Sequence, residues 1–203
     1  MNIHSKIVAA IFALAASATL ASPADELLDF KFTDQLGRAV SINDFRGQAV
    51  ALTFFYTRCP VPEFCPRLSK NFQMAQQTLA AMTNAPANWH LISVSFDPDD
   101  SPQTLRRYAE SYHYDARHWT FLTGPREKIA GLARAAGAQF TPDGGVITHN
   151  FRTIILDANG RLQMVFPTGG DLSRQIVSEL LKAAAVKDPL AGDKEKTAAA
   201  APR

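Results

Sequence analysis

The two cysteines of the chain, Cys59 and Cys65, are the side chains best suited to chemistry. Five residues separate them, and a loop that short can bring two sulfur atoms within bonding distance. Cys65 precedes Pro66 and a helical pattern of apolar residues, so it lies at or next to the expected N-terminus of a helix. Unsatisfied N–H groups there favour a thiolate, which should lower the pKa of the Cys65 thiol. The pair is therefore a candidate redox couple, and each thiolate is a candidate soft metal ligand.

A purely structural disulfide is the alternative for this pair. Residues 1–21 have the layout of a secretory signal peptide, with one positive charge, an apolar stretch and small residues up to Ala21, after which we expect cleavage. Export would place the protein where disulfides persist. Structural bridges, however, usually join segments far apart in the sequence, whereas this pair spans a strand end, a Pro-rich loop and a helix start. We therefore favour the redox-active interpretation.

Length and charge limit the remaining classes of function. We expect one domain over residues 22–186 and a disordered tail over residues 187–203, which has no apolar period. The chain has 21 Lys and Arg against 19 Asp and Glu, a formal net charge of +2. That balance suggests neither nucleic acid nor an anionic membrane surface as a partner. We expect a periplasmic monomer with no membrane span after cleavage, and an uncleaved anchor in the inner membrane is the alternative.

The pattern of apolar residues indicates how the chain positions the cysteines. Residues 49–56 and 89–96 are apolar runs without charge, separated by the helix that begins near Cys65, which predicts a parallel βαβ unit. Further elements are expected as a hairpin over 28–42, a helix over 102–112, a strand over 119–123, a helix over 125–136, a hairpin over 151–166 and a helix over 172–185. This order predicts an α/β, thioredoxin-like fold with an N-terminal β-hairpin extension.

Four ordered motifs connect the cysteines to a known family. They are Phe54-Phe-Tyr-Thr-Arg-Cys59-Pro with Cys65-Pro-Arg-Leu-Ser, then Ile92-Ser-Val-Ser-Phe-Asp97-Pro, then Phe121-Leu-Thr-Gly124, then His149-Asn-Phe-Arg-Thr-Ile-Ile-Leu-Asp157-Ala-Asn-Gly160. They resemble the signatures of the Sco/SenC family of copper-binding, thioredoxin-like proteins, which assist assembly of the binuclear copper centre of cytochrome c oxidase. The resemblance covers roughly residues 28–185. It implies copper ligation by Cys59, Cys65 and His149.

Two departures from the family pattern bear on the site. Most members have three residues between the cysteines, whereas this chain has five. The Asp-Pro loop is one residue shorter than usual, which leaves Asp97 and Asp100 as candidates for the acidic group nearest the cysteines; we choose Asp97 because Pro98 follows it directly. His149 follows the Gly144-Gly145 loop, and we expect a flexible loop to carry its imidazole toward the cysteines.

Other potential ligands fit structural roles better. The remaining histidines of the expected domain lack such a context and are expected to be structural or exposed, namely His90, His113 and His118. The methionines after residue 21 are dispersed, which favours core packing over a Met-rich copper site; they are Met74, Met82 and Met164.

Two classes of function remain open. A metallochaperone would hold Cu(I) or Cu(II) through two thiolates and one imidazole and pass it to a copper-accepting subunit of a respiratory oxidase, or to another copper or thiol protein. A structural zinc site would lack one ligand. A thiol-disulfide oxidoreductase would use the same cysteine pair to reduce a partner's cysteines, and this possibility leaves open whether the protein is an enzyme. Only His149 separates the two, since disulfide exchange needs no imidazole; we favour copper delivery.

Overall fold

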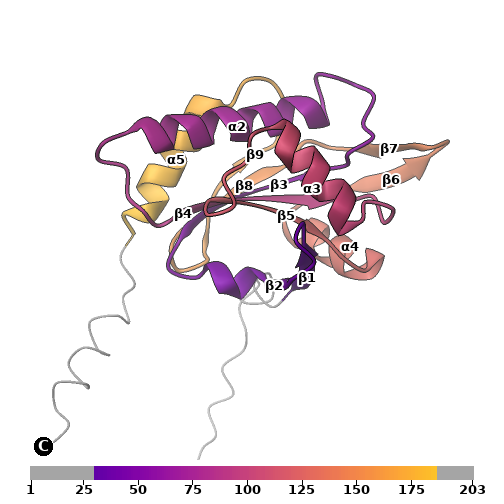
Figure 1. Cartoon of the computed structure of the whole chain (residues 1–203), viewed down its shortest axis with the longest axis horizontal. Coiled ribbons are helices and arrows are strands. Elements are labelled where there is room, and N and C mark those ends of the chain that lie inside the picture. The colour runs from indigo at the N-terminus through magenta and orange to yellow at the C-terminus, as the bar shows by residue number, and fades with distance from the viewer. Residues whose placement is uncertain (1–29, 187–203) are drawn as a thin grey trace, which may run out of the picture.

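The fold is built on a mixed β-sheet with helices on both faces (Figure 1). The structure is a computed structural model, and it describes residues 30–186. Within that range the sheet has seven strands in the order β2-β1-β5-β4-β3-β8-β9. Their bounds are β1 Lys31–Asp34, β2 Ala39–Ser41, β3 Ala49–Phe55, β4 Trp89–Ser95, β5 Trp119–Thr123, β8 Thr153–Leu156 and β9 Leu162–Phe166. The helices are the 3-10 helix η1 Ile42–Phe45, α2 Cys65–Ala81, α3 Pro102–Ser111, α4 Arg126–Ala135 and α5 Ser173–Ala184.

The parallel core agrees with the sequence-based prediction. β3 pairs in parallel with β4, and β4 pairs in parallel with β5, so α2 and α3 are the crossover connections between them. β8 joins β3 antiparallel and continues into β9, while the β1–β2 hairpin joins the other side through β5. This is the expected α/β, thioredoxin-like architecture with an N-terminal hairpin. The expected signal peptide (residues 1–21), the first part of the expected domain (22–29) and the expected tail (187–203) lie outside the described residues.

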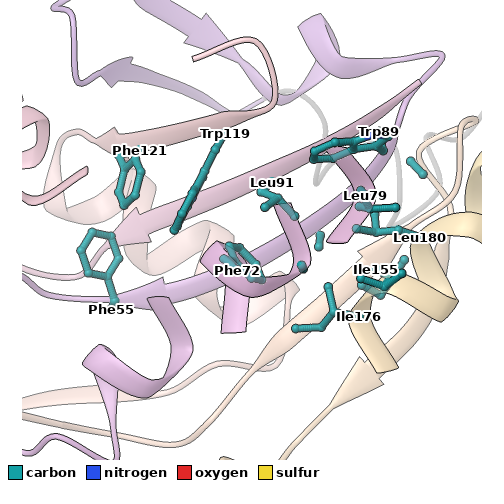
Figure 2. Packing of buried hydrophobic residues seen from close by; sticks show 14 of the residues in the cluster. Phe55, Phe72, Leu79, Trp89, Leu91, Trp119, Phe121, Ile155, Ile176 and Leu180 are labelled. Carbon is teal, nitrogen blue, oxygen red and sulfur yellow. The ribbon is translucent and has the colours of Figure 1, made fainter. Parts of the chain in front are cut away.

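Alternate residues of β3 separate the core into two halves. Val50, Leu52 and Phe54 belong to a cluster under α4 and η1, whereas Ala49, Ala51 and Phe55 belong to a cluster under α2, α3 and α5. Successive side chains of a strand point to opposite faces, so a strand buried on both faces needs an unbroken apolar sequence. Figure 2 shows the second cluster, in which Phe72 and Leu79 of α2 and Ile176 and Leu180 of α5 lie over Leu91 and Ile155 of the sheet. The core between the sheet and the helices that follow the cysteines is therefore tightly packed.

Helix α2 begins at Cys65, which fixes this residue at a helix N-terminus as expected. Pro66 occupies the second helical position, where the missing N–H leaves no intrahelical hydrogen bond unmade. The buried positions recur every three or four residues and include Leu68, Phe72, Ala75 and Leu79, so one stripe of the helix packs on the sheet. Cys65 thereby stands on a rigid element at the end of β3.

One hairpin was not predicted. β6 (Phe140–Asp143) and β7 (Val146–His149) pair antiparallel, although only a loop at Gly144-Gly145, with no strand directly on either side of it, was expected from the sequence. Gly144 and Gly145 have φ values of 54° and 92°, the left-handed conformations of a two-residue hairpin turn. Pro142 is compatible with a strand whose N–H side needs no partner. Among the described strands, this pair is not hydrogen-bonded to the main sheet, and it projects from the right-hand side of the molecule in Figure 1.

The expectation that the methionines pack in the core is wrong. Met74, Met82 and Met164 have exposed fractions of 40%, 39% and 37%. Met74 lies between the buried positions of α2, Met82 follows the last turn of that helix, and Met164 lies on the edge strand β9. Within residues 30–186, no helix is both long enough and apolar enough to span a bilayer.

Candidate metal centre

The structure brings together two of the three predicted ligands. Cys65 is the first residue of α2 and His149 the last residue of β7, and the distance from Cys65 Sγ to His149 Nε2 is 3.3 Å. Cys65 has no exposed surface, and His149 is partly buried. Eighty-four positions separate these residues in the chain, so the contact depends on how the β6–β7 hairpin folds over the start of α2.

A backbone carbonyl sets the orientation of the imidazole. His149 Nδ1 lies 3.0 Å from the carbonyl oxygen of Asn150, which only accepts hydrogen bonds, so Nδ1 carries the proton. Nε2 then has a free lone pair and accepts from the Cys65 thiol. Burial lowers the pKa of His149, so the imidazole is neutral near pH 7. A neutral imidazole held by its second nitrogen is the form that binds a metal.

The predicted thiolate at Cys65 is not supported by its surroundings. Burial raises the pKa of the Cys65 thiol well above its ordinary value, and the neighbouring Cys59 raises it further. Hydrogen bonding from the Tyr56 backbone acts in the opposite direction but is the smaller influence. Desolvation of a thiolate therefore outweighs the helix N-terminus, and in the metal-free protein Cys65 is a neutral thiol.

Cys59 occupies the loop after β3 and is half-buried. Its thiol makes a weak hydrogen bond to the carbonyl oxygen of Val61, with 3.8 Å between the two atoms. Both cysteines are free thiols in the structure. Across residues 30–186, no three His, Cys, Asp or Glu side chains are arranged to hold a metal ion. Cys65 contacts His149, and Cys59 is close enough to Cys65 to raise the pKa of its thiol, but ligation by all three residues stays a prediction.

Two buried carboxylates hold the residues that precede Cys59. Asp97 accepts hydrogen bonds from Arg58 at 2.6 Å and 3.0 Å. Asp100 accepts from the Thr57 backbone N–H at 3.0 Å and from the Thr57 hydroxyl. Both Asp97 and Asp100 are 2% exposed. Our choice of Asp97 as the acidic group nearest the sulfurs stays a prediction, while the described hydrogen bonds give both carboxylates the role of fixing the Cys59 loop.

Aromatic side chains surround His149, and the sequence-based reasoning missed them as part of the site. Four described rings have centroids within 6.3 Å of the imidazole: Phe96 at 5.2 Å, Phe151 at 6.1 Å, Tyr56 at 6.2 Å and Phe64 at 6.3 Å. The Tyr56 hydroxyl also accepts a hydrogen bond of 3.4 Å from the Ile147 N–H, which ties β7 to the end of β3. Each of these aromatic residues lies within three positions of a predicted site residue, and that proximity was the available signal.

The other histidines are structural or exposed, as predicted. His90 is buried and its Nε2 lies 2.8 Å from the Thr120 hydroxyl. His118 stacks on Trp89 with ring centroids 4.0 Å apart, and its Nδ1 lies 3.1 Å from the Trp89 carbonyl. His113 is exposed. None of the three lies in the group formed by Cys65 and His149.

Fold and site together define a thioredoxin-like protein whose strand-to-helix turn carries two thiols beneath an imidazole. A family model described as SCO1/SenC matches residues 18–185, which is most of the chain. The chain belongs to this family, as the motifs predicted.

Related proteins and structures agree with this membership. The SCO1 protein homolog of Bacillus subtilis is 31% identical over 100 residues, covering 49% of this chain and 49% of its own length. The mitochondrial SCO2 homolog of Bos taurus is 31% identical over 140 residues, covering 65% of this chain and 50% of its own. The chain thus spans about half the length of these curated relatives.

Solved structures show the same fold. Bradyrhizobium japonicum ScoI, solved with copper bound, has a TM-score of 0.60 and 26% identity over 76% of this chain and 96% of that one. BsSco, described as having a disulfide switch and as a member of the Sco family of cytochrome c oxidase assembly proteins, has a TM-score of 0.66 and 25% identity over 78% of this chain and 92% of that one.

Proposed function

We propose that this protein binds copper through Cys59, Cys65 and His149 and delivers it during assembly of the binuclear copper centre of cytochrome c oxidase. The observation that carries the proposal is the 3.3 Å contact between Cys65 Sγ and His149 Nε2. A redox pair alone gives no reason to hold an oriented, neutral imidazole on one of its sulfurs. The copper-bound structure of Bradyrhizobium japonicum ScoI supports the same assignment.

The donor atoms fit copper. Two thiolates and one imidazole are soft ligands that suit Cu(I) in a three-coordinate site and also hold Cu(II). His149 already presents the lone pair of Nε2, whereas Cys65 is protonated, so metal binding releases its proton. Copper is the cargo here, and the residues of this chain bind and orient it.

Transfer to a partner follows from the different burial of the ligands. Cys59 is half-buried on a loop, while Cys65 is fully buried at the start of α2. An incoming thiolate therefore reaches copper on the Cys59 side and replaces the ligands one after another. We propose a copper-accepting subunit of a respiratory oxidase as the recipient, or another copper or thiol protein, and the periplasm as the location because of the predicted signal peptide at residues 1–21.

A substitution of His149 tests the proposal. The reduced protein is expected to bind one Cu(I), and His149→Ala is expected to weaken binding by at least about tenfold to a hundredfold, the cost of losing only an outer hydrogen-bond partner of a ligand. His113→Asn is the matched control, because His113 is exposed, lies outside the site and has a φ of 51° that asparagine tolerates. Unchanged copper affinity in His149→Ala would refute the assignment.

A thiol-disulfide oxidoreductase is the second candidate. The observation that favours it is the proximity of Cys59 to Cys65, which is close enough to raise the pKa of the Cys65 thiol. One cysteine would attack a partner disulfide and the other would resolve the mixed disulfide. Measuring the reduction of a model disulfide in the same variants separates the two functions, since His149→Ala is expected to retain this reaction. If His149→Ala no longer reduces the model disulfide but binds copper normally, the oxidoreductase is favoured.

A further inference from the structure

The last residue of the loop between the cysteines, Phe64, lies against the imidazole of the site. Its ring centroid is 6.3 Å from that of His149 at an interplanar angle of 72°, and 5.1 Å from that of Phe151 at 86°. The rings of His149 and Phe151 are in turn 6.1 Å apart at 77°. The three rings thus form a closed set of edge-to-face contacts, the arrangement that aromatic pairs prefer.

The inner members of this set have little freedom to move. A Cβ atom added at Gly169 would lie 2.9 Å from the Phe151 ring, so this ring rests directly on the Gly169 backbone. On its other side the imidazole meets Phe96, which is 1% exposed, at a centroid distance of 5.2 Å. The imidazole of His149 therefore packs against the Phe96 and Phe151 rings, and Phe64 contacts it on the side that faces solvent.

Phe64 is held by its backbone and remains partly exposed. Its N–H donates to the Val61 carbonyl at 3.0 Å, and its own carbonyl accepts from the Leu68 N–H at 3.1 Å in the first turn of α2. The residue is 40% exposed, whereas Cys65, directly after it, has no exposed surface. The side chain consequently covers the buried Cys65 and the partly buried His149 while itself facing water.

The geometry points to Phe64 as a positioning residue that holds the imidazole of His149 on Cys65 in the metal-free protein. Phe64 is the spacer residue that directly precedes Cys65. With Cys65 and His149 covered, the half-buried Cys59 is the thiol that a reagent or a partner's thiolate meets first. This inference rests on the proposed function, because it concerns the same three ligands.

The decisive variant is Phe64→Ala, studied as the reduced, metal-free full chain. The variant loses the ring contacts of Phe64 with His149 and Phe151. The loss of each contact is expected to make the arrangement in which His149 has left Cys65 several-fold more populated. We expect alkylation of Cys65 by iodoacetamide to accelerate about tenfold, with the rate at Cys59 changed less than twofold. We also expect the ¹⁵N signals of the His149 ring to change from the Nδ1–H tautomer, which the Asn150 carbonyl selects, to the mixture found for a free imidazole.

Three further variants make the result specific. Val61→Ala changes an exposed apolar residue of the same loop that has no described ring contact with His149, and it is expected to leave the Cys65 rate and the tautomer unchanged. Phe64→Tyr keeps the ring and is expected to restore the wild-type values of both. If Phe64→Ala does not fold, Phe64→Val replaces it with the same expectations. The inference is overturned if Phe64→Ala, or Phe64→Val in its place, alkylates Cys65 at the wild-type rate and keeps the wild-type tautomer of His149. It is also overturned if Val61→Ala accelerates the alkylation of Cys65 as much as the substitution of Phe64 does.

These readouts use no copper. A protein that fails to bind copper can therefore still satisfy the inference about Phe64, and a copper-binding protein can still contradict it.

Discussion

Replacing Asp100 tests whether its buried carboxylate stabilises the loop that carries Cys59. Asp100 is 2% exposed and accepts hydrogen bonds from the Thr57 N–H, the Thr57 hydroxyl and the Ser95 hydroxyl, the last at 2.6 Å. Thr57 is half-buried, so water can satisfy its hydroxyl in the variant Asp100→Ala. The Thr57 N–H and the Ser95 hydroxyl, which is fully buried, lose their acceptor.

The magnitude follows from these two orphaned donors. A buried donor without a partner costs about 1–3 kcal/mol. Relief of the desolvation of the carboxylate offsets part of this, so we expect Asp100→Ala to lower the free energy of unfolding by about 3 kcal/mol. For a domain of this size, that corresponds to a fall in Tm of about 6–12 °C.

Thermal unfolding of the reduced, metal-free protein, followed by circular dichroism, measures this effect. The neighbouring Asp99 is the matched control, because its side chain is 81% exposed and its ion pair with the exposed Arg58 is 3.5 Å long. Asp99→Ala is expected to change stability by less than about 0.5 kcal/mol. Equal Tm values for the two variants would refute the view that the Asp100 hydrogen bonds stabilise the loop.

Two more predictions concern the cysteines and the pH dependence of stability. Protein isolated from an oxidising compartment is expected to carry a Cys59–Cys65 disulfide that reductant opens reversibly, and mass spectrometry before and after alkylation checks this; two freely alkylated thiols in air-equilibrated, metal-free protein would contradict it. Burial, helped by the nearby His118, lowers the pKa of His90 to about 3, so below about pH 6.5 the unfolded chain binds a proton that the native state does not. Stability is therefore lost as the pH falls, and urea unfolding at pH 6.5 and 5 is expected to show a decline about 1.6 kcal/mol smaller in His90→Gln; equal declines would show that His90 is not responsible.

The parallel core of the fold is predictable because its strands leave little ambiguity. Ala49–Phe55 and Trp89–Ser95 are buried at every position, which requires the charge-free sequences they have. The hairpin of β6 and β7 was not predictable in the same way. All positions of its two strands are exposed or only partly buried, so its apolar pattern is weak, and Pro142 and the two glycines resemble a loop. The two strands form because they pair with each other, and this pairing leaves no regular pattern of apolar residues in the sequence.

The candidate site shows the same division between local and tertiary effects. The position of Cys65 at a helix start is local and was correctly predicted. The pKa of its thiol was predicted in the wrong direction, because burial depends on groups brought together from distant parts of the chain, such as His149. His149 itself was identified only through the family resemblance, since a single histidine on an exposed hairpin has no distinguishing sequence pattern.

Because the β6–β7 hairpin is separate from the main sheet, Cys65 and His149 lie on two different parts of the fold. Cys65 begins a helix that packs on the main sheet, whereas His149 belongs to a separate hairpin that contacts the rest of the protein through the Phe96–Phe140 ring pair and the hydrogen bond to Tyr56, among others. The hairpin that carries His149 can therefore move relative to Cys65 without unfolding of the whole domain. Substitutions in the Gly144-Gly145 turn are therefore expected to change the contact between His149 and Cys65 more than they change the stability of the core.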